Sequence, residues 1–115
     1  MQYVLLIYQN EGEFAKLSDA EKGPLYQEYG PFTESISKSG HFREGNGLQP
    51  TATATTVRMR NGKRLVTDGP FAETKEQLAG YYLIEAKDLD EAITIAARVP
   101  SARLGSVEIR PVIEM

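Results

Sequence analysis

The stretch Thr67–Glu85, TDGPFAETKEQLAGYYLIE, joins a tight turn to a strongly apolar segment. Gly69 can adopt backbone angles that other residues avoid, and Pro70 fixes its own φ and removes a hydrogen-bond donor. Asp68 is therefore expected on a stiff corner, where a folded chain can hold a functional group in place. The alternative is an ordinary turn, in which the Asp68 carboxylate bonds its own backbone two residues on.

Two further segments predict the first half of the fold. Tyr3–Tyr8 is a continuous apolar run rich in β-forming residues, which predicts a strand buried on both faces. Ser18–Gly40 begins with a capping-box pattern and then carries apolar residues at helical spacing. Because Pro24 and Pro31 fall inside this helix, we expect a kink or break near Gly30.

The second half of the sequence predicts a hairpin, a central strand, a helix and a final strand. Asn61-Gly62 is a strong signal for a two-residue turn between the hairpin strands Thr53–Arg60 and Lys63–Thr67, and carries no expected function. The other three elements are expected at Leu78–Ala86, from Asp88 to Pro100, and at Ser106–Val112. His41–Leu48 is expected as a short strand or loop. The order β-α-β-β-β-α-β predicts a single α+β domain over residues 1–115, ferredoxin-like, with an antiparallel sheet and two helices on one face.

The predicted central strands are apolar on both faces. Val4 and Leu6 alternate with Leu5 and Ile7 in the first strand, and Leu78–Ala86 shows the same pattern. Two helices on one face of the sheet leave the other face bare, and an exposed apolar face of that extent marks an interaction surface. A two-fold pair of identical chains is the commonest way to cover it, so the sequence predicts a homodimer.

Composition limits the classes of function. The chain has 115 residues and no cysteine, which excludes disulfides, thiolate metal sites and a cysteine nucleophile, and is compatible with a cytoplasmic location. Its 13 basic and 16 acidic residues do not give the basic surface of a nucleic-acid-binding protein. The basic residues between 58 and 64 are interpreted as a solvated hairpin tip. With His41 as its one histidine, the chain has no His-based metal site, and it shows no leader and no apolar run long enough to span a bilayer.

Several ordered blocks of the sequence resemble the DGPF-type proteins of the YCII-related superfamily. The signature is Asp68-Gly69-Pro70-Phe71 followed by Ala72–Glu76; the other blocks are Met1–Tyr8, Gly47–Pro50, Thr53–Arg58 and Gly105–Val112. The resemblance extends over nearly the whole chain, and it implies a ferredoxin-like subunit that pairs into a dimeric α+β barrel. Relatives with this signature are often found beside genes for sigma factors of the extracytoplasmic type. The resemblance therefore also implies a sigma-factor-related partner in transcriptional signalling.

The chain departs from the better-studied YCII-like relatives at one position. Those relatives are thought to use a His–Asp pair with the histidine on the first helix, and the first predicted helix here has no histidine. The corresponding stretch offers Glu28 and Tyr29 instead. Tyr29 shares a helical stripe with Leu25 and Phe32, so it is either a core aromatic whose hydroxyl finds a partner or a residue of the site.

The sequence leaves two functions open. One is the binding of a small ligand in a cleft, by a non-catalytic or regulatory protein. The other is a cofactor-independent isomerase or lyase, with Asp68 as general base and Tyr29 or Lys75 as donors to developing oxyanion charge. The expected cleft lies between the first helix and the sheet and is lined by Asp68, Tyr29, Phe71 and Lys75, with Gln49 reaching it from a loop. Because no complete catalytic set can be assembled, the sequence favours the binder.

Overall fold

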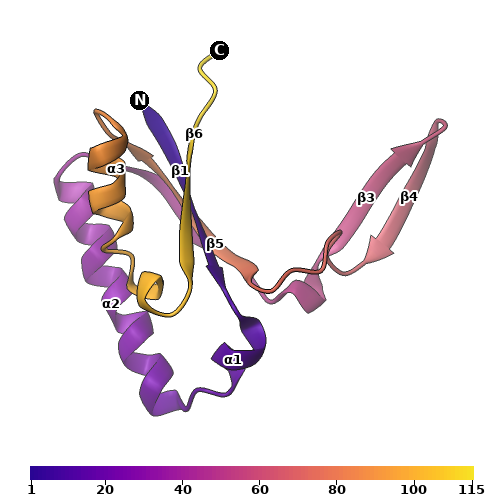
Figure 1. The fold of residues 1–115 in the computed structure, drawn as a ribbon, viewed down its shortest axis with the longest axis horizontal. Helices are drawn as coiled ribbons and strands as arrows, with labels where there is room; N and C mark the ends of the chain where they lie inside the picture. The colour runs from indigo at the N-terminus through magenta and orange to yellow at the C-terminus, as the bar shows by residue number, and fades with distance from the viewer.

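A four-stranded antiparallel sheet with helices on one face forms the body of the protein in a computed structural model that describes all of residues 1–115. The elements are β1 (Gln2–Gln9), α1 (Glu11–Ala15), α2 (Asp19–Lys38), β2 (Phe42–Gly47), η1 (Thr51–Thr53), β3 (Thr55–Arg60), β4 (Lys63–Asp68), β5 (Gln77–Glu85), α3 (Leu89–Ala96), η2 (Pro100–Arg103) and β6 (Ser106–Pro111). The sheet order is β2-β5-β1-β6, and β3 and β4 form a separate hairpin. Figure 1 shows α2 and α3 on one side of the sheet and the hairpin on the other. The predicted α+β fold is confirmed.

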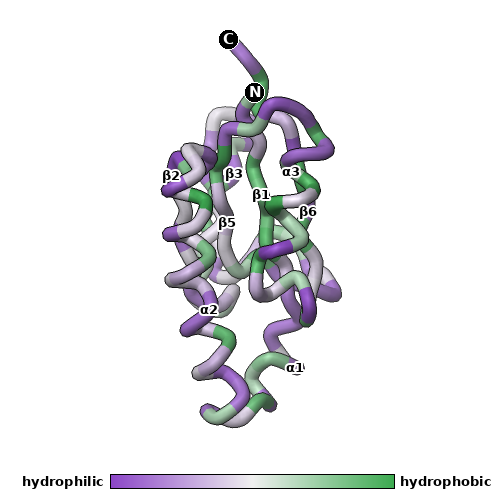
Figure 2. Tube along the Cα trace, turned by 90° about the vertical axis from the view of Figure 1, so that its left-hand side faces the viewer, coloured by the Kyte–Doolittle hydropathy of each residue, from purple (hydrophilic) through white to green (hydrophobic).

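One face of the central strands makes the hydrophobic core. In the register of the sheet, Leu5 lies opposite Tyr82 on β5 and opposite Ile109 on β6, so these side chains share the helix-covered face. Figure 2 shows hydrophobic residues along β1 and a more polar α2. The buried cluster consists of Tyr3, Leu5, Ile7, Phe32, Ile36, Tyr82, Ile84, Ala86, Ala92, Ile95, Ala96 and Val99.

The opposite face of the sheet is apolar but open to solvent in the single chain. Val4 lies opposite Leu83 and Leu6 opposite Tyr81, and all four side chains are only partly buried. The prediction that β1 is buried on both faces is therefore wrong for one copy of the chain. The reason is that both long helices cover the same side of the sheet.

The helix α2 runs without a break through both of its prolines, so no break occurs near Gly30. Each proline follows a glycine, in Gly23-Pro24 and Gly30-Pro31. A side chain on the residue before proline clashes with the proline ring in the helical conformation, and glycine has no Cβ to make that clash. Buried residues on both sides of Pro31 also hold α2 against the sheet; they are Leu25, Phe32 and Ile36.

The predicted hairpin turn is confirmed. Asn61 and Gly62 have φ values of 52° and 74°, as a two-residue hairpin turn of the primed type requires. All but one of the residues of β3 and β4 are exposed, and the hairpin extends away from the body as an arm, defined here as Thr55–Asp68 (Figure 1).

Three short helical segments were not predicted. The α1 helix is capped by Asn10, whose side chain accepts a hydrogen bond from the Glu13 amide, and with 5 residues it is too short to show a helical period. The η1 segment is tied to it, because the Glu11 carboxylate accepts bonds of 2.8 Å from the Thr51 amide and hydroxyl. The η2 segment starts at Pro100, where the sequence predicted only the end of a helix. No helix of the protein is long and apolar enough to cross a membrane.

The Gly-Pro explanation for α2 predicts the effect of a side chain before Pro31. We expect Gly30→Val to lower the free energy of unfolding by about 1–2 kcal/mol, because a Cβ and its branches clash with the proline ring. The control is Gln27→Val, one turn earlier and exposed, which loses only about 0.5 kcal/mol of helix propensity. Urea unfolding followed by circular dichroism measures both. If both variants lost the same free energy of unfolding, the glycine at position 30 would not be the reason that α2 continues through Pro31.

Candidate functional site

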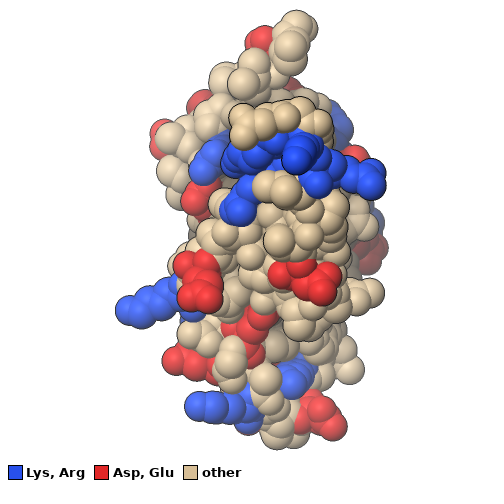
Figure 3. Space-filling view, turned by 90° about the vertical axis from the view of Figure 1, so that its right-hand side faces the viewer, with Lys and Arg blue, Asp and Glu red and all other residues tan.

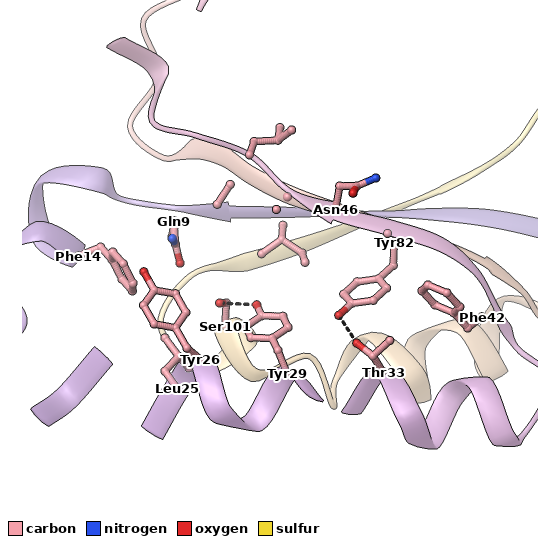
Figure 4. Close-up of a pocket in the computed structure, with 16 residues that line it drawn as sticks. Gln9, Phe14, Leu25, Tyr26, Tyr29, Thr33, Phe42, Asn46, Tyr82 and Ser101 are labelled. Carbon is pink, nitrogen blue, oxygen red and sulfur yellow. Dashed lines mark hydrogen bonds between the residues drawn. The ribbon is translucent and has the colours of Figure 1, made fainter. Parts of the chain in front are cut away.

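A cavity of about 390 Å³ lies between α2 and the helix-covered face of the sheet (Figure 4). Its walls come from β1, α1, α2, β2, β5 and η2, and its volume falls in the range typical of sites for small molecules. It is the candidate functional site.

Three glycines form the floor of the cavity. Gly47 on β2 lies opposite Gly80 on β5, and Gly45 lies opposite Tyr82, so all three face the helices. A Cβ built at Gly45 would lie 2.7 Å from Cδ1 of Tyr82, and one at Gly80 would lie 2.9 Å from the Asn46 carbonyl oxygen. At Gly47 nothing lies within 4 Å of such a Cβ. The space therefore exists because the strands lack side chains here, which is a common reason for glycine inside a strand.

Aromatic rings form the walls. They belong to Phe14, Tyr26, Tyr29, Phe42 and Tyr82. The first two meet edge to face with their centroids 6.0 Å apart, and the last two meet in the same way at 6.0 Å. Edge-to-face contacts are a favourable arrangement of aromatic rings, so within each pair one ring helps to fix the orientation of the other.

Two hydroxyl pairs cross the cavity wall. The Tyr29 hydroxyl donates a 2.6 Å hydrogen bond to Ser101 Oγ, which links α2 to η2, and the Tyr82 and Thr33 hydroxyls share a bond of 2.7 Å (Figure 4). Burial raises the pKa of Tyr82 above its ordinary value, and so keeps its phenol neutral. Tyr29 is thus a core aromatic whose hydroxyl has a partner; its ring also lines the cavity, and its role in a site stays a prediction.

The Gln9 side chain carries the one buried side-chain atom of the cavity lining that lacks a hydrogen-bond partner. Its Oε1 is buried and accepts no hydrogen bond, and its amide points into the cavity from the end of β1 (Figure 4). A buried acceptor without a donor costs free energy, about 1–3 kcal/mol. This oxygen is therefore the atom that a ligand with an N–H or O–H group would satisfy.

An ion pair outside the cavity holds its η2 wall in place. The Arg103 guanidinium on η2 donates two hydrogen bonds, of 3.1 and 2.6 Å, to the carboxylate of Glu28 on α2. Glu28 is next to Tyr29 in the sequence and Arg103 lies two residues after Ser101, so this pair and the Tyr29–Ser101 bond join the same two segments, α2 and η2. The bond from Arg103 lowers the pKa of Glu28 below its ordinary value of 4.5.

Of the residues predicted for the site, Tyr29 lines this cavity. Asp68 lies exposed at the base of the arm, Phe71 is 77% exposed, and Gln49 lies exposed in the loop after β2. The Lys75 carbonyl accepts a 3.2 Å bond from Asn10 at the start of α1. One copy of the chain thus does not bring these four residues into the cavity with Tyr29, and their shared cleft stays a prediction.

The Asp68 corner is held by other groups than its carboxylate. The Gly69 amide donates a 2.7 Å bond to the Ala54 carbonyl, and the Thr56 hydroxyl donates a 2.8 Å bond to the Gly69 carbonyl. Gly69 itself has a φ of 92°, which favours glycine. The chain bends at Gly69 directly after β4, and the two bonds that hold this bend come from the β3 side of the arm and not from the Asp68 carboxylate.

His41 links two helices and lies outside the cavity. Its Nδ1 lies 2.7 Å from Ser39 Oγ, and its Nε2 lies 3.0 Å from the carboxylate of Glu91 on α3. The structure has no group of three or more His, Asp or Glu side chains placed to hold a metal ion.

Sequence reasoning missed Gln9, Thr33, Ser101 and the glycine floor. The glycines did leave a signal, since Gly45-Asn46-Gly47 and Gly80 interrupt strand segments where side chains would normally pack. Gln9 and Ser101 left none, because their place in the cavity depends on how β1 ends and on η2.

The fold and the cavity define a ferredoxin-like α+β protein with a neutral, aromatic pocket between helix and sheet. Comparison with known protein families shows that the YCII-related domain matches residues 1–115. An uncharacterized protein of Rhizobium meliloti (strain 1021) is 37% identical over 113 residues, which cover 96% of this chain and 91% of that protein. The chain belongs to the YCII-related family, and the family resemblance of its sequence is confirmed.

The Glu28–Arg103 pair predicts a pH-dependent contribution to stability. A carboxyl whose pKa is lowered by folding stabilises the folded state above its unfolded-state pKa, and this contribution disappears as the pH falls through the lowered value. We therefore expect Glu28→Gln to melt at a lower temperature than the wild type at neutral pH. The difference should close as the pH falls below 4.5.

Thermal melts across this pH range measure the effect, and Arg103→Gln supplies the control. In that background the guanidinium that lowers the Glu28 pKa is gone, so adding Glu28→Gln should produce no pH-dependent difference. A difference that persists unchanged below pH 4.5 would contradict the role of the ion pair.

Proposed function

We propose that this protein binds a small uncharged ring compound that carries a hydrogen-bond donor, in the cavity between α2 and the sheet. The observation that carries the proposal is the Gln9 oxygen, which is buried, unpartnered and directed into a pocket with aromatic walls. Rings of the ligand match the aromatic walls, and its N–H or O–H group supplies the missing bond to Gln9.

The lining of the cavity favours binding over catalysis. Its 16 residues include no Asp, Glu, His, Lys or Arg. General acid–base catalysis most often uses such a group within hydrogen-bond reach of the substrate, and two of the three lining tyrosines, Tyr29 and Tyr82, already bond Ser101 and Thr33. The alternative, a cofactor-independent isomerase or lyase with Asp68 as general base, therefore requires an arrangement of chains in which Asp68 reaches a bound substrate.

A regulatory role, a cytoplasmic location and a single domain each have separate support. A regulatory role linked to sigma factors is supported by the family resemblance, and the cavity would then act as its sensor. A cytoplasmic location is supported by the absence of cysteine. A single domain over residues 1–115 is supported by the match of one domain family to the whole chain.

We also propose that a second copy of the chain covers the bare face of the sheet. Only 16 of the 115 residues are buried in one copy, which is a small core for a chain of this length. The partly exposed stripe of Val4, Leu6, Tyr81 and Leu83 is apolar and continuous across β1 and β5. Pairing two such stripes about a two-fold axis buries both.

Filling the floor of the cavity tests the ligand site. A leucine at position 47 meets no atom within 4 Å at its Cβ, so Gly47→Leu should fold while its side chain occupies the cavity. Titration with phenol, followed by the amide NMR signals of Gly45 and Gly80, should shift these signals in the wild type and leave them unchanged in Gly47→Leu. The control, Gln27→Leu, adds the same side chain on the exposed side of α2 and should respond as the wild type does. Equal shifts in Gly47→Leu would place the phenol elsewhere.

The role of Gln9 is tested with the same signals. Anisole matches phenol but lacks the hydroxyl hydrogen, so it should bind about tenfold more weakly than phenol, as expected for one buried hydrogen bond. In Gln9→Leu this preference should disappear. A preference that survives the substitution would show that another acceptor holds the hydroxyl.

A charge on the bare face tests the homodimer. Light scattering coupled to gel filtration should give at least twice the chain mass for the wild type, and half of the wild-type mass for Leu6→Asp at micromolar concentration, because the variant would bury an unpaired carboxylate in the sheet-face contact. The control, Ser37→Asp, places the same charge on the exposed side of α2 and should keep the wild-type mass. A wild-type protein that is a stable monomer at this concentration would contradict the proposal.

A further inference from the structure

The arm, Thr55–Asp68, is not supported by the body of its own chain. It contains four large apolar side chains that are each about half exposed: Val57, Met59, Leu65 and Val66. An isolated two-stranded hairpin is marginally stable at best in water. The radius of gyration of the chain is 16.1 Å, compared with about 13 Å for a compact domain of this length. Both observations indicate that the arm packs against something outside its own chain.

The register of the hairpin separates its two faces. Residues that lie opposite each other on paired strands share a face, and alternate residues along a strand share it too. One face therefore carries Val57, Val66 and Met59, with Arg64 toward the tip and Asp68 at the base. The other face carries most of the basic residues, namely Arg58, Arg60 and Lys63, together with Leu65.

The first face, which we call the apolar arm face, is complementary to itself. Along β4 its side chains are Arg64, Val66 and Asp68, with Val66 midway between the two charges and paired with Val57. A two-fold axis through the Val57–Val66 pair would place the Arg64 of each arm against the Asp68 of the other. The two contacts are then identical, as a two-fold interface requires.

We infer that the apolar arm faces of two copies pack against each other antiparallel, with Val57 and Val66 at the centre and two Arg64–Asp68 ion pairs at the ends. Two packed sheets lie about 10 Å apart, a gap that an arginine and an aspartate side chain can bridge together. The Asp68 carboxylate is exposed in the single chain, and its turn is held by the Gly69 and Thr56 bonds, so it is free to pair. This contact is separate from the sheet-face contact proposed above.

The distribution of charge on the arm favours a second copy of the chain over a nucleic acid as the partner that covers the apolar arm face. Figure 3 shows a band of Lys and Arg side chains on the side of the molecule from which the arm projects. The arm holds 4 of the 13 basic residues and 1 of the 16 acidic residues, which leaves the body acidic. Three of these four cations lie on the face opposite the contact, and the apolar arm face itself carries one charge of each sign. The phosphate backbone of a nucleic acid is bound by a surface rich in cations. The apolar arm face does not have that character, because its centre is apolar and its two charges are of opposite sign.

Charge reversal with mixing tests the pairing. Asp68→Arg places two arginines at each end of the contact, and Arg64→Asp places two aspartates there. Sedimentation equilibrium should show that the self-association constant of each variant is at least about tenfold weaker than that of the wild type. Co-expression of the two variants creates a mixed pair in which both ends again join an arginine to an aspartate, and its association should return to within about threefold of the wild type.

Two further variants complete the test. The double variant Asp68→Arg with Arg64→Asp should also associate as the wild type does, because it exchanges the two charges within each chain. Arg60→Asp makes the same change of net charge on the opposite face of the arm and should stay within about threefold of the wild type. Circular dichroism checks that each variant is folded, and salt of about 1 M should reduce the contrast between single and mixed variants, since it screens exposed ion pairs.

Other results would overturn the inference. Single variants that associate as the wild type does would show that the arms do not meet through these charges. Weakened variants that are not restored by mixing would show that the arm meets a different surface. A 20-base-pair DNA duplex that binds a monomeric wild type, and is released by Arg60→Asp, would make the arm a nucleic-acid-binding ribbon instead.

Discussion

The contact between α2 and the central strand pair holds the rest of the structure in place. Leu5 on β1, Ile84 on β5 and Ile36 on α2 are each completely buried, and they meet in one layer. This layer fixes how close α2 lies to the sheet. Where the strands carry large side chains, the gap is filled and forms the core. Where β2 and β5 carry glycines, the same gap remains open as the cavity.

The polarity of the cavity follows from what its side chains already bond. The hydroxyls of Tyr29 and Tyr82 are used by Ser101 and Thr33, so they fix the walls and leave little bonding capacity for a ligand. Gln9 differs because β1 ends beside it and no neighbouring donor reaches its oxygen. A neutral pocket with one buried free acceptor selects for shape and for a donor at that place, and it gives no advantage to a charged ligand.

The division of the molecule into a body and an arm has an energetic basis. The body buries an apolar layer under its helices, whereas the arm buries almost nothing by itself. Its strands are held by their own ladder and by a turn with positive φ at Asn61 and Gly62. Such a hairpin has a conformation encoded locally, but its stability depends on contacts that a single chain does not supply.

Local patterns in the sequence determined the strands, the capping box of α2, the hairpin turn and the order of the elements. These features depend on neighbours in the chain, through the alternation of side chains, the capping bonds and the backbone freedom of glycine. The helix α2 continues through Pro31 because Gly30 precedes the proline and because tertiary packing holds the helix against the sheet. Pro31 by itself predicts a kink or break of the helix, and that prediction leaves out the role of this glycine. The cavity was also decided by tertiary structure. Gln9, Thr33, Gly47 and Ser101 are far apart in sequence and meet only because the sheet order places β2 and β5 beneath α2 and η2. The periodicity of one segment shows which face of that segment is buried, and so the sequence by itself predicted the layers of helix and strand. It does not show where two layers leave a gap, and so only the tertiary structure defined the pocket between them.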